Sequence, residues 1–224
     1  ICTPHLGAST KEAQQNVAKD VAEQIIDYLL NNTARNAVNV PNISAELMSL
    51  LTPFATLTEK IGLMQAQLSD SGVEKVSVRY CGKISEYDTA PLTAALLKGL
   101  LTPILKDDVN YINAPFIAKD RGIEVTEAKT RTSENFSSLV VVKVTSVESE
   151  NLVSGTIFGR DLPRILRINE LYLEAVPEGP VLLVDCANTP GVMGRVGTIL
   201  GEHDINIDSL QMGRDGSNDH SVAY

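Results

Sequence analysis

The chain has 224 residues, of which 43% are hydrophobic and 21% charged, and its formal net charge is −9. This length leaves room for one to three modest domains with ordinary globular cores. The acidic charge disfavours nucleic-acid binding, because phosphate backbones would be repelled. The sequence shows no apolar run of membrane-spanning length and no signal peptide, so we expect a cytoplasmic protein without membrane or nucleic-acid partners.

The first predicted element is a helix over residues 9–31, which Ser9 and Glu12 would start as a capping box. Its apolar residues recur at spacings of three and four, which places them on one face. These residues are Ala13, Val17, Val21, Ile25 and Tyr28. An Asn-rich linker with Pro41 near its end follows, so residues 1–43 form a first unit.

A second unit is predicted over residues 44–177, with helices and strands mixed. Apolar spacing indicates a core-facing helix over residues 47–68, in which Pro53 marks a kink or a start. Alternation of Val76, Val78 and Tyr80 with polar residues predicts a half-buried strand. The remaining predicted elements are a helix over 91–105, a polar surface loop over 129–138 and strands over 137–147, 151–159 and 163–176.

A third unit is predicted over residues 178–224, in the order strand, helix, strand, strand. The expected elements are a strand over 181–187, a helix capped by Thr189 with Pro190 at its first position, and strands over 205–213 and from 220 onward. A closing helix and strand are missing from this pattern. The fold class is therefore α+β.

Three cysteines, Cys2, Cys81 and Cys186, are far apart and odd in number, and none belongs to a C-x-x-C pair. This pattern argues against a disulfide framework and favours a reducing compartment. His203 and His220 lack the spacing of metal ligands, so we expect no metal site.

His5 lies two residues before Gly7 on a loop that leads into the first helix, where its near-neutral pKa range would suit acid–base chemistry. The alternative is that His5 is a hydrogen-bonded loop histidine with a purely structural role. The stretch "TPHLGAST", followed by "NAVNVP", resembles the D-2-hydroxyacid dehydrogenases, and within them the long D-3-phosphoglycerate dehydrogenases. The resemblance implies that His5 is the catalytic acid–base of an NAD-dependent enzyme acting on 3-phosphoglycerate. It also implies that residues 1–43 end a Rossmann and substrate domain pair.

The main NAD site is expected to lie outside this sequence. A dinucleotide fold needs a G-x-G-x-x-G turn after a strand, and the sequence contains none. We therefore expect this chain alone to have no dehydrogenase activity.

The segment around "NTPGVMG" combines a strand end, a glycine turn and a helix start, which favours an anion. Such turns also occur without any ligand. The pattern through "INIDSLQ" resembles the ACT domain, a ferredoxin-like βαββαβ regulatory module, here incomplete. The resemblance implies an L-serine site between paired domains, and hence a homo-oligomer through the ACT and intervening domains. Its residues would be Asn188, Asn206, the backbone of Val192 and Met193, and Cys186 in place of a polar contact.

The stretches "SGTIFG" and "RILRIN" resemble the intervening domain of the long phosphoglycerate dehydrogenases. That resemblance implies an anion-binding role for Arg164, while a second basic position of some relatives falls on Val176. The alternative is that Arg164 is a solvated strand charge. Taken together, the predicted function is the C-terminal regulatory part of such an enzyme, with L-serine feedback. A free-standing amino-acid-binding module and a serine dehydratase subunit are the rival hypotheses.

Overall fold

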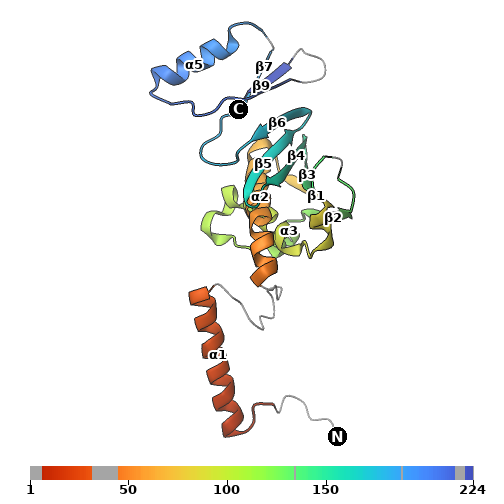
Figure 1. The fold of residues 1–224 in the computed structure, drawn as a ribbon, viewed down its shortest axis with the longest axis vertical. Coiled ribbons are helices and arrows are strands. Elements are labelled where there is room, and N and C mark those ends of the chain that lie inside the picture. The colour runs from red at the N-terminus through yellow and green to blue at the C-terminus, as the bar shows by residue number, and fades with distance from the viewer. Residues whose placement is uncertain (1–6, 32–44, 134, 188, 215–219, 224) are drawn as a thin grey trace. The chain divides into compact units, whose positions relative to one another are not determined.

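A computed structural model describes residues 7–31, 45–133, 135–187, 189–214 and 220–223 (Figure 1). Its contacts cluster into two compact units, Ile1–Ser49 and Leu50–Tyr224, which are described separately. The predictions on His5 and Asn188 fall outside the described residues.

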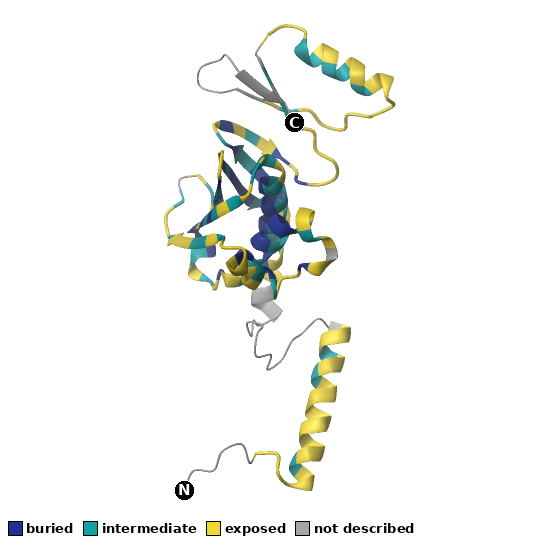
Figure 2. Cartoon of the chain, turned by 180° about the vertical axis from the view of Figure 1, so that it is seen from behind, coloured by how far each residue is buried: buried dark blue, intermediate teal, exposed yellow. Residues whose placement is uncertain are grey.

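Within the first unit, the predicted N-terminal helix is present as α1 (Lys11–Asn31). The hydroxyl of Thr10, one residue after the predicted cap, accepts a hydrogen bond from the backbone N–H of Ala13 at 3.1 Å. The predicted apolar face is largely open to solvent, since Val17, Val21 and Ile25 are about half exposed (Figure 2).

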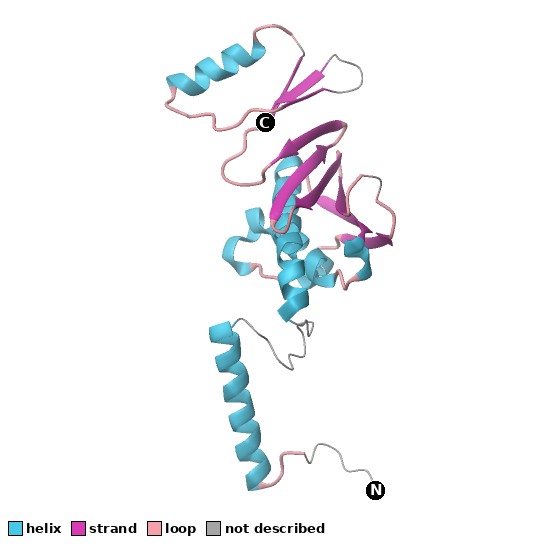
Figure 3. Cartoon of the chain, viewed as in Figure 1, coloured by secondary structure: helices cyan, strands magenta, loops and turns pink. Residues whose placement is uncertain are grey.

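The second unit contains a six-stranded sheet with the order β2-β1-β3-β4-β5-β6 (Figure 3). Neighbouring strands are antiparallel except for β1 and β2, which are parallel. The strands are β1 (Val73–Gly82), β2 (Glu124–Thr130), β3 (Ser138–Ser146), β4 (Glu150–Phe158), β5 (Leu162–Ile168) and β6 (Leu171–Ala175). The mixed α+β class is confirmed.

Helices α2 (Ala45–Leu68) and α3 (Ala90–Leu105) pack on one face of this sheet, and α4 (Ala114–Asp120) leads into β2. The predicted core-facing helix is confirmed, because Leu57 and Ile61 of α2 are fully buried. Pro53 lies inside α2. The predicted alternation of β1 is also confirmed, since Val76, Val78 and Tyr80 are buried. Two short 3₁₀ helices complete this layer, η1 (Lys83–Glu86) and η2 (Lys106–Asp108).

The predicted strand over 163–176 is wrong as one element, because it forms the hairpin of β5 and β6. Asn169 takes a left-handed conformation at the turn, with φ 50°. This short polar turn divides the predicted strand into two, although the alternation of apolar and polar residues continues on both sides of it. The elements β2 and α4 were not predicted.

The C-terminal part contains β7 (Val184–Ala187), α5 (Val192–Glu202), β8 (Met212–Arg214) and β9 (His220–Ala223). Its antiparallel sheet has the order β7-β9-β8, so the predicted strand, helix, strand, strand sequence is confirmed. The predicted helix start is wrong, since Gly191, with φ 87°, is the N-cap rather than Thr189. The predicted strand over 205–213 is shorter and begins at Met212.

Candidate functional site

The N-terminus of α5 is the first part of the candidate site. Gly191 adopts a left-handed conformation at the N-cap, and its carbonyl accepts the N–H of Arg195 at 3.0 Å. Val192 and Met193 follow in the first turn, where backbone N–H groups lack intrahelical partners. An added Cβ at Gly194 would meet nothing within 4 Å, so this backbone is approachable. The local geometry therefore suits a small anion.

A cavity of about 710 Å³ brings several predicted site residues together. Arg164, Met193 and Asn206 all line it, whereas Val192 and Cys186 do not. The amide of Asn206 donates to a carboxylate oxygen of Asp208 at 2.6 Å and is exposed. The side-chain carbonyl of Asn206 therefore stays available to a ligand's donor groups.

The lining of this cavity carries both signs of charge. Arg164 contributes a guanidinium group, while Glu174, Glu178 and Asp208 contribute carboxylates. A zwitterionic molecule would find partners for both of its ionic groups in such a lining.

The side chain of Arg164 has three partners within the protein. Its Nε lies 3.6 Å from a carboxylate oxygen of Glu174, and its Nη1 donates to the carbonyl of Pro163 at 2.9 Å. Its guanidinium group also lies over the Phe158 ring, 5.7 Å from the centroid. An anion at Arg164 would therefore compete with Glu174.

Sequence reasoning missed Glu174 and Gln211 in this lining. The backbone N–H of Glu174 donates to the side-chain carbonyl of Gln211 at 3.0 Å. These residues are 37 positions apart and belong to no recognisable motif, so spacing alone gave no signal.

The described residues do not form a dinucleotide-binding fold. The sequence has no G-x-G-x-x-G turn, and β1 and β2 are the only parallel pair among the strands described. No helix in the described part of the chain is long and apolar enough to span a membrane. The same residues contain no group of three or more histidine, cysteine, aspartate or glutamate side chains arranged to hold a metal ion.

Comparison with known proteins gives two family matches. Residues 50–169 match the D-3-phosphoglycerate dehydrogenase intervening domain, and residues 180–222 match the ACT domain. Among similar curated proteins named D-3-phosphoglycerate dehydrogenase, that of Synechocystis sp. is 40% identical over 96% of this chain. Those of Archaeoglobus fulgidus and Bacillus subtilis are 39% and 37% identical, each also over 96% of the chain.

The chain spans 39%, 41% and 41% of the length of these three relatives. The intervening-domain match covers more than half of the chain and includes the whole of β1 through β5. The chain therefore belongs to the D-3-phosphoglycerate dehydrogenase intervening-domain family and carries an ACT domain after it.

Proposed function

We propose that this chain is the C-terminal regulatory part of an NAD-dependent D-3-phosphoglycerate dehydrogenase. The parent enzyme oxidises 3-phosphoglycerate in the synthesis of L-serine, with His5 as its acid–base. The ACT domain binds L-serine as a feedback effector. The two domain matches, together with relatives that carry this name over nearly the whole chain, support the proposal.

The mixed charge of the cavity beside α5 is the observation that carries the serine site. Its lining offers Arg164 for a carboxylate and Glu174, Glu178 and Asp208 for an ammonium group. Asn206 supplies an amide for the serine hydroxyl or ammonium. Met193 lies in the same lining, and the family resemblance adds Val192, Cys186 and Asn188 to the proposed contacts, although Val192 and Cys186 do not line this cavity.

Regulation follows if serine favours one arrangement of paired ACT domains. The apolar side chains of this part are open in the single chain, with Ile199 and Ile205 more than half exposed, which suits pairing between copies. A homo-oligomer that closes over serine would transmit about 1–3 kcal/mol of coupling to the active site.

Calorimetric titration of L-serine into the chain tests the site, with D-serine as the ligand control. We expect binding of L-serine alone and its loss in Asn206→Ala. Gln67→Ala is the matched variant, since it removes an amide from α2 that lies outside the cavity lining. Equal affinity in Asn206→Ala and Gln67→Ala contradicts the proposed contact.

An activity assay separates the regulatory role from catalysis. We expect the purified chain to show no NAD-dependent turnover of 3-phosphoglycerate, because it holds no dinucleotide turn. Joined to its native catalytic half, it should confer inhibition by L-serine. Turnover by the chain alone, or full activity of the joined protein in saturating L-serine, overturns the respective part of the proposal.

A further inference from the structure

The sheet face opposite α2 and α3 carries a second cavity of about 710 Å³. Its floor consists of half-buried aliphatic residues on three neighbouring strands, namely Leu139, Val141, Leu152 and Leu166. Its rim comes from Thr132, Ser133 and Asn135, before β3. Neither Arg164 nor any residue of the ACT domain lines this cavity, so it is separate from the site described above.

Two arginines flank the floor in a single cross-strand row. Arg79 pairs with Val141, Val141 with Ser154, and Ser154 with Arg167, across β1, β3, β4 and β5. Three strand spacings separate the backbones of the two arginines by about 14 Å. The cavity therefore presents one cation at each end of an apolar strip.

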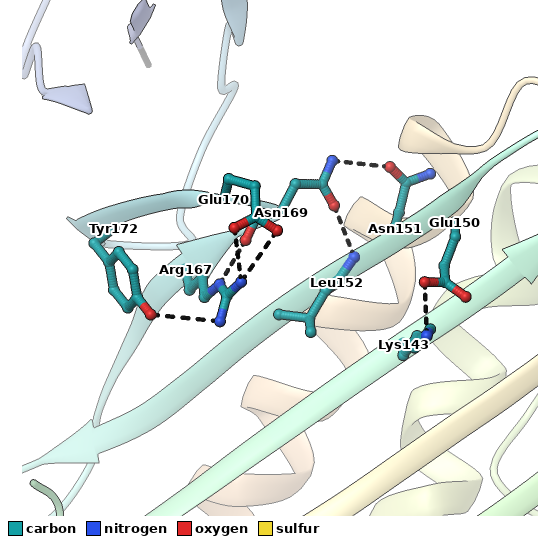
Figure 4. Close-up of polar contacts among 8 residues, drawn as sticks. All are labelled: Lys143, Glu150, Asn151, Leu152, Arg167, Asn169, Glu170 and Tyr172. Carbon is teal, nitrogen blue, oxygen red and sulfur yellow. Dashed lines mark hydrogen bonds and ion pairs between the residues drawn. The ribbon is translucent and has the colours of Figure 1, made fainter. Parts of the chain in front are cut away.

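The two cations differ in how they are held. Arg167 donates through Nε to the carbonyl of Asn169 at 2.5 Å, and its guanidinium lies over the Tyr172 ring, 5.1 Å from the centroid (Figure 4). Its carboxylate partner, Glu170, is 3.4 Å away and has an 82% exposed side chain, which makes a weak and exchangeable ion pair.

Arg79 is the open end of the row. It is exposed, and no described carboxylate lies within 4.0 Å of its nitrogens. The net charge of the chain is −9, yet this guanidinium group beside the cavity has no carboxylate partner among the described residues. It is therefore available to bind an anion.

The rim contributes an unsatisfied polar atom. The hydroxyl oxygen of Ser133 is buried and has no hydrogen-bond partner among the described residues, although Ser133 lines the cavity. Gly82, with φ 77°, lies directly against this loop. An added Cβ there would lie 2.3 Å from the carbonyl oxygen of Ser137, so the close approach requires glycine. A buried hydroxyl left unpaired is costly, and a ligand oxygen in the cavity would satisfy it.

We propose that this cavity binds a small linear dicarboxylate. One carboxylate pairs with Arg79, the other displaces Glu170 from Arg167, and the methylene chain crosses Val141 and the aliphatic floor. The hydroxyl of Ser133 donates to a carboxylate oxygen. Charge at both ends with an apolar middle matches a dicarboxylate better than a short polar dianion, which would leave the floor in contact with water.

Calorimetric titration of adipate into the full chain tests this site, with hexanoate and malonate as comparison ligands. We expect adipate to bind at least about tenfold more tightly than either, because hexanoate lacks one charged contact and malonate lacks the chain. Arg79→Ala should weaken adipate binding by about tenfold or more. Arg121→Ala, which removes an exposed arginine from the end of α4, should leave the affinity unchanged.

Equal affinity for adipate in Arg79→Ala and Arg121→Ala overturns the proposal, as does equal affinity for malonate and adipate. Unchanged adipate binding in Asn206→Ala separates this result from the serine site, and loss of binding there would place adipate in the ACT cavity instead.

Discussion

At the scale of single residues, Tyr80 couples the stability of the second unit to pH. Its side chain is fully buried, and its hydroxyl lies 2.9 Å from that of Thr93. Burial raises the pKa of Tyr80 well above its usual range, the hydrogen bond to Thr93 opposes this, and the charge of Glu127 adds to it. In the unfolded chain tyrosine ionises near pH ~10, so the unfolded state loses this proton first and stability falls as the pH rises.

Tyr80→Phe should therefore cost less stability at high pH than at neutral pH. At pH 7 we expect it to lower the free energy of unfolding by about 1 kcal/mol, because the Thr93 hydroxyl loses its partner. Above pH ~10 the deficit should shrink by up to about 1.4 kcal/mol per pH unit. Urea denaturation at pH 7 and 11 measures both values. Tyr28→Phe, at an exposed position of α1, is the matched variant, and a pH-independent deficit in Tyr80→Phe contradicts the argument.

The candidate site residues were only partly predictable from sequence. Arg164 and Asn206 were identified through family resemblance, and the structure places both on one cavity. Their acidic neighbour Glu174 was not predicted, because it reaches Arg164 only through the β5–β6 hairpin. The roles of all these residues stay predictions until a ligand is measured. Spacing along the chain cannot reveal a pair that a hairpin turn creates.

At the scale of elements, α2 and α3 approach each other through glycine. An added Cβ at Gly99 would lie 2.0 Å from the carbonyl oxygen of Glu59, and one at Gly62 would lie 2.1 Å from that of Leu96. Both obstacles are backbone atoms, so the helices themselves would have to separate. The Lys98–Glu59 ion pair, at 2.6 Å, spans the same crossing.

Gly99→Ala should destabilise the chain although alanine is the better helix former. We expect a loss of about 1–3 kcal/mol or more, since overpacking outweighs the gain in helix propensity. Gly197→Ala, in α5, is the matched variant because its added Cβ would meet nothing within 4 Å. Far-UV circular dichroism during urea denaturation measures both. A Gly99→Ala protein as stable as Gly197→Ala would show that the two helices shift apart at little cost.

Elements with a clear periodicity were predictable, and those that depend on tertiary pairing were not. The alternation of β1 and the apolar spacing of α2 each predicted the buried face. β2 was missed because "EVTEAKT" is a mostly polar edge strand, held by parallel pairing to β1. The start of α5 was placed too early, since Gly191 can adopt the positive φ of the N-cap without strain.

At the scale of the whole molecule, the division into Ile1–Ser49 and Leu50–Tyr224 predicts that the larger unit folds by itself. Its buried core lies in the six-stranded sheet and the helices on it, and the described residues of the first unit contribute no strand to that sheet. A protein of residues 45–224, which keeps α2 intact, should unfold with a free energy within about 0.5 kcal/mol of the full chain. Urea denaturation followed by far-UV circular dichroism compares the two.

The opposite behaviour is expected of the first unit. A peptide of residues 7–31 should be only weakly helical in water, because most helical stability in proteins comes from packing of an apolar face, and the apolar face of α1 is open. Its circular dichroism, measured beside the 45–224 protein, tests whether α1 depends on contacts beyond itself. A fully helical peptide would assign its stability to local sequence. A large loss of stability in the 45–224 protein would show that the two units fold together, against the division in their contacts.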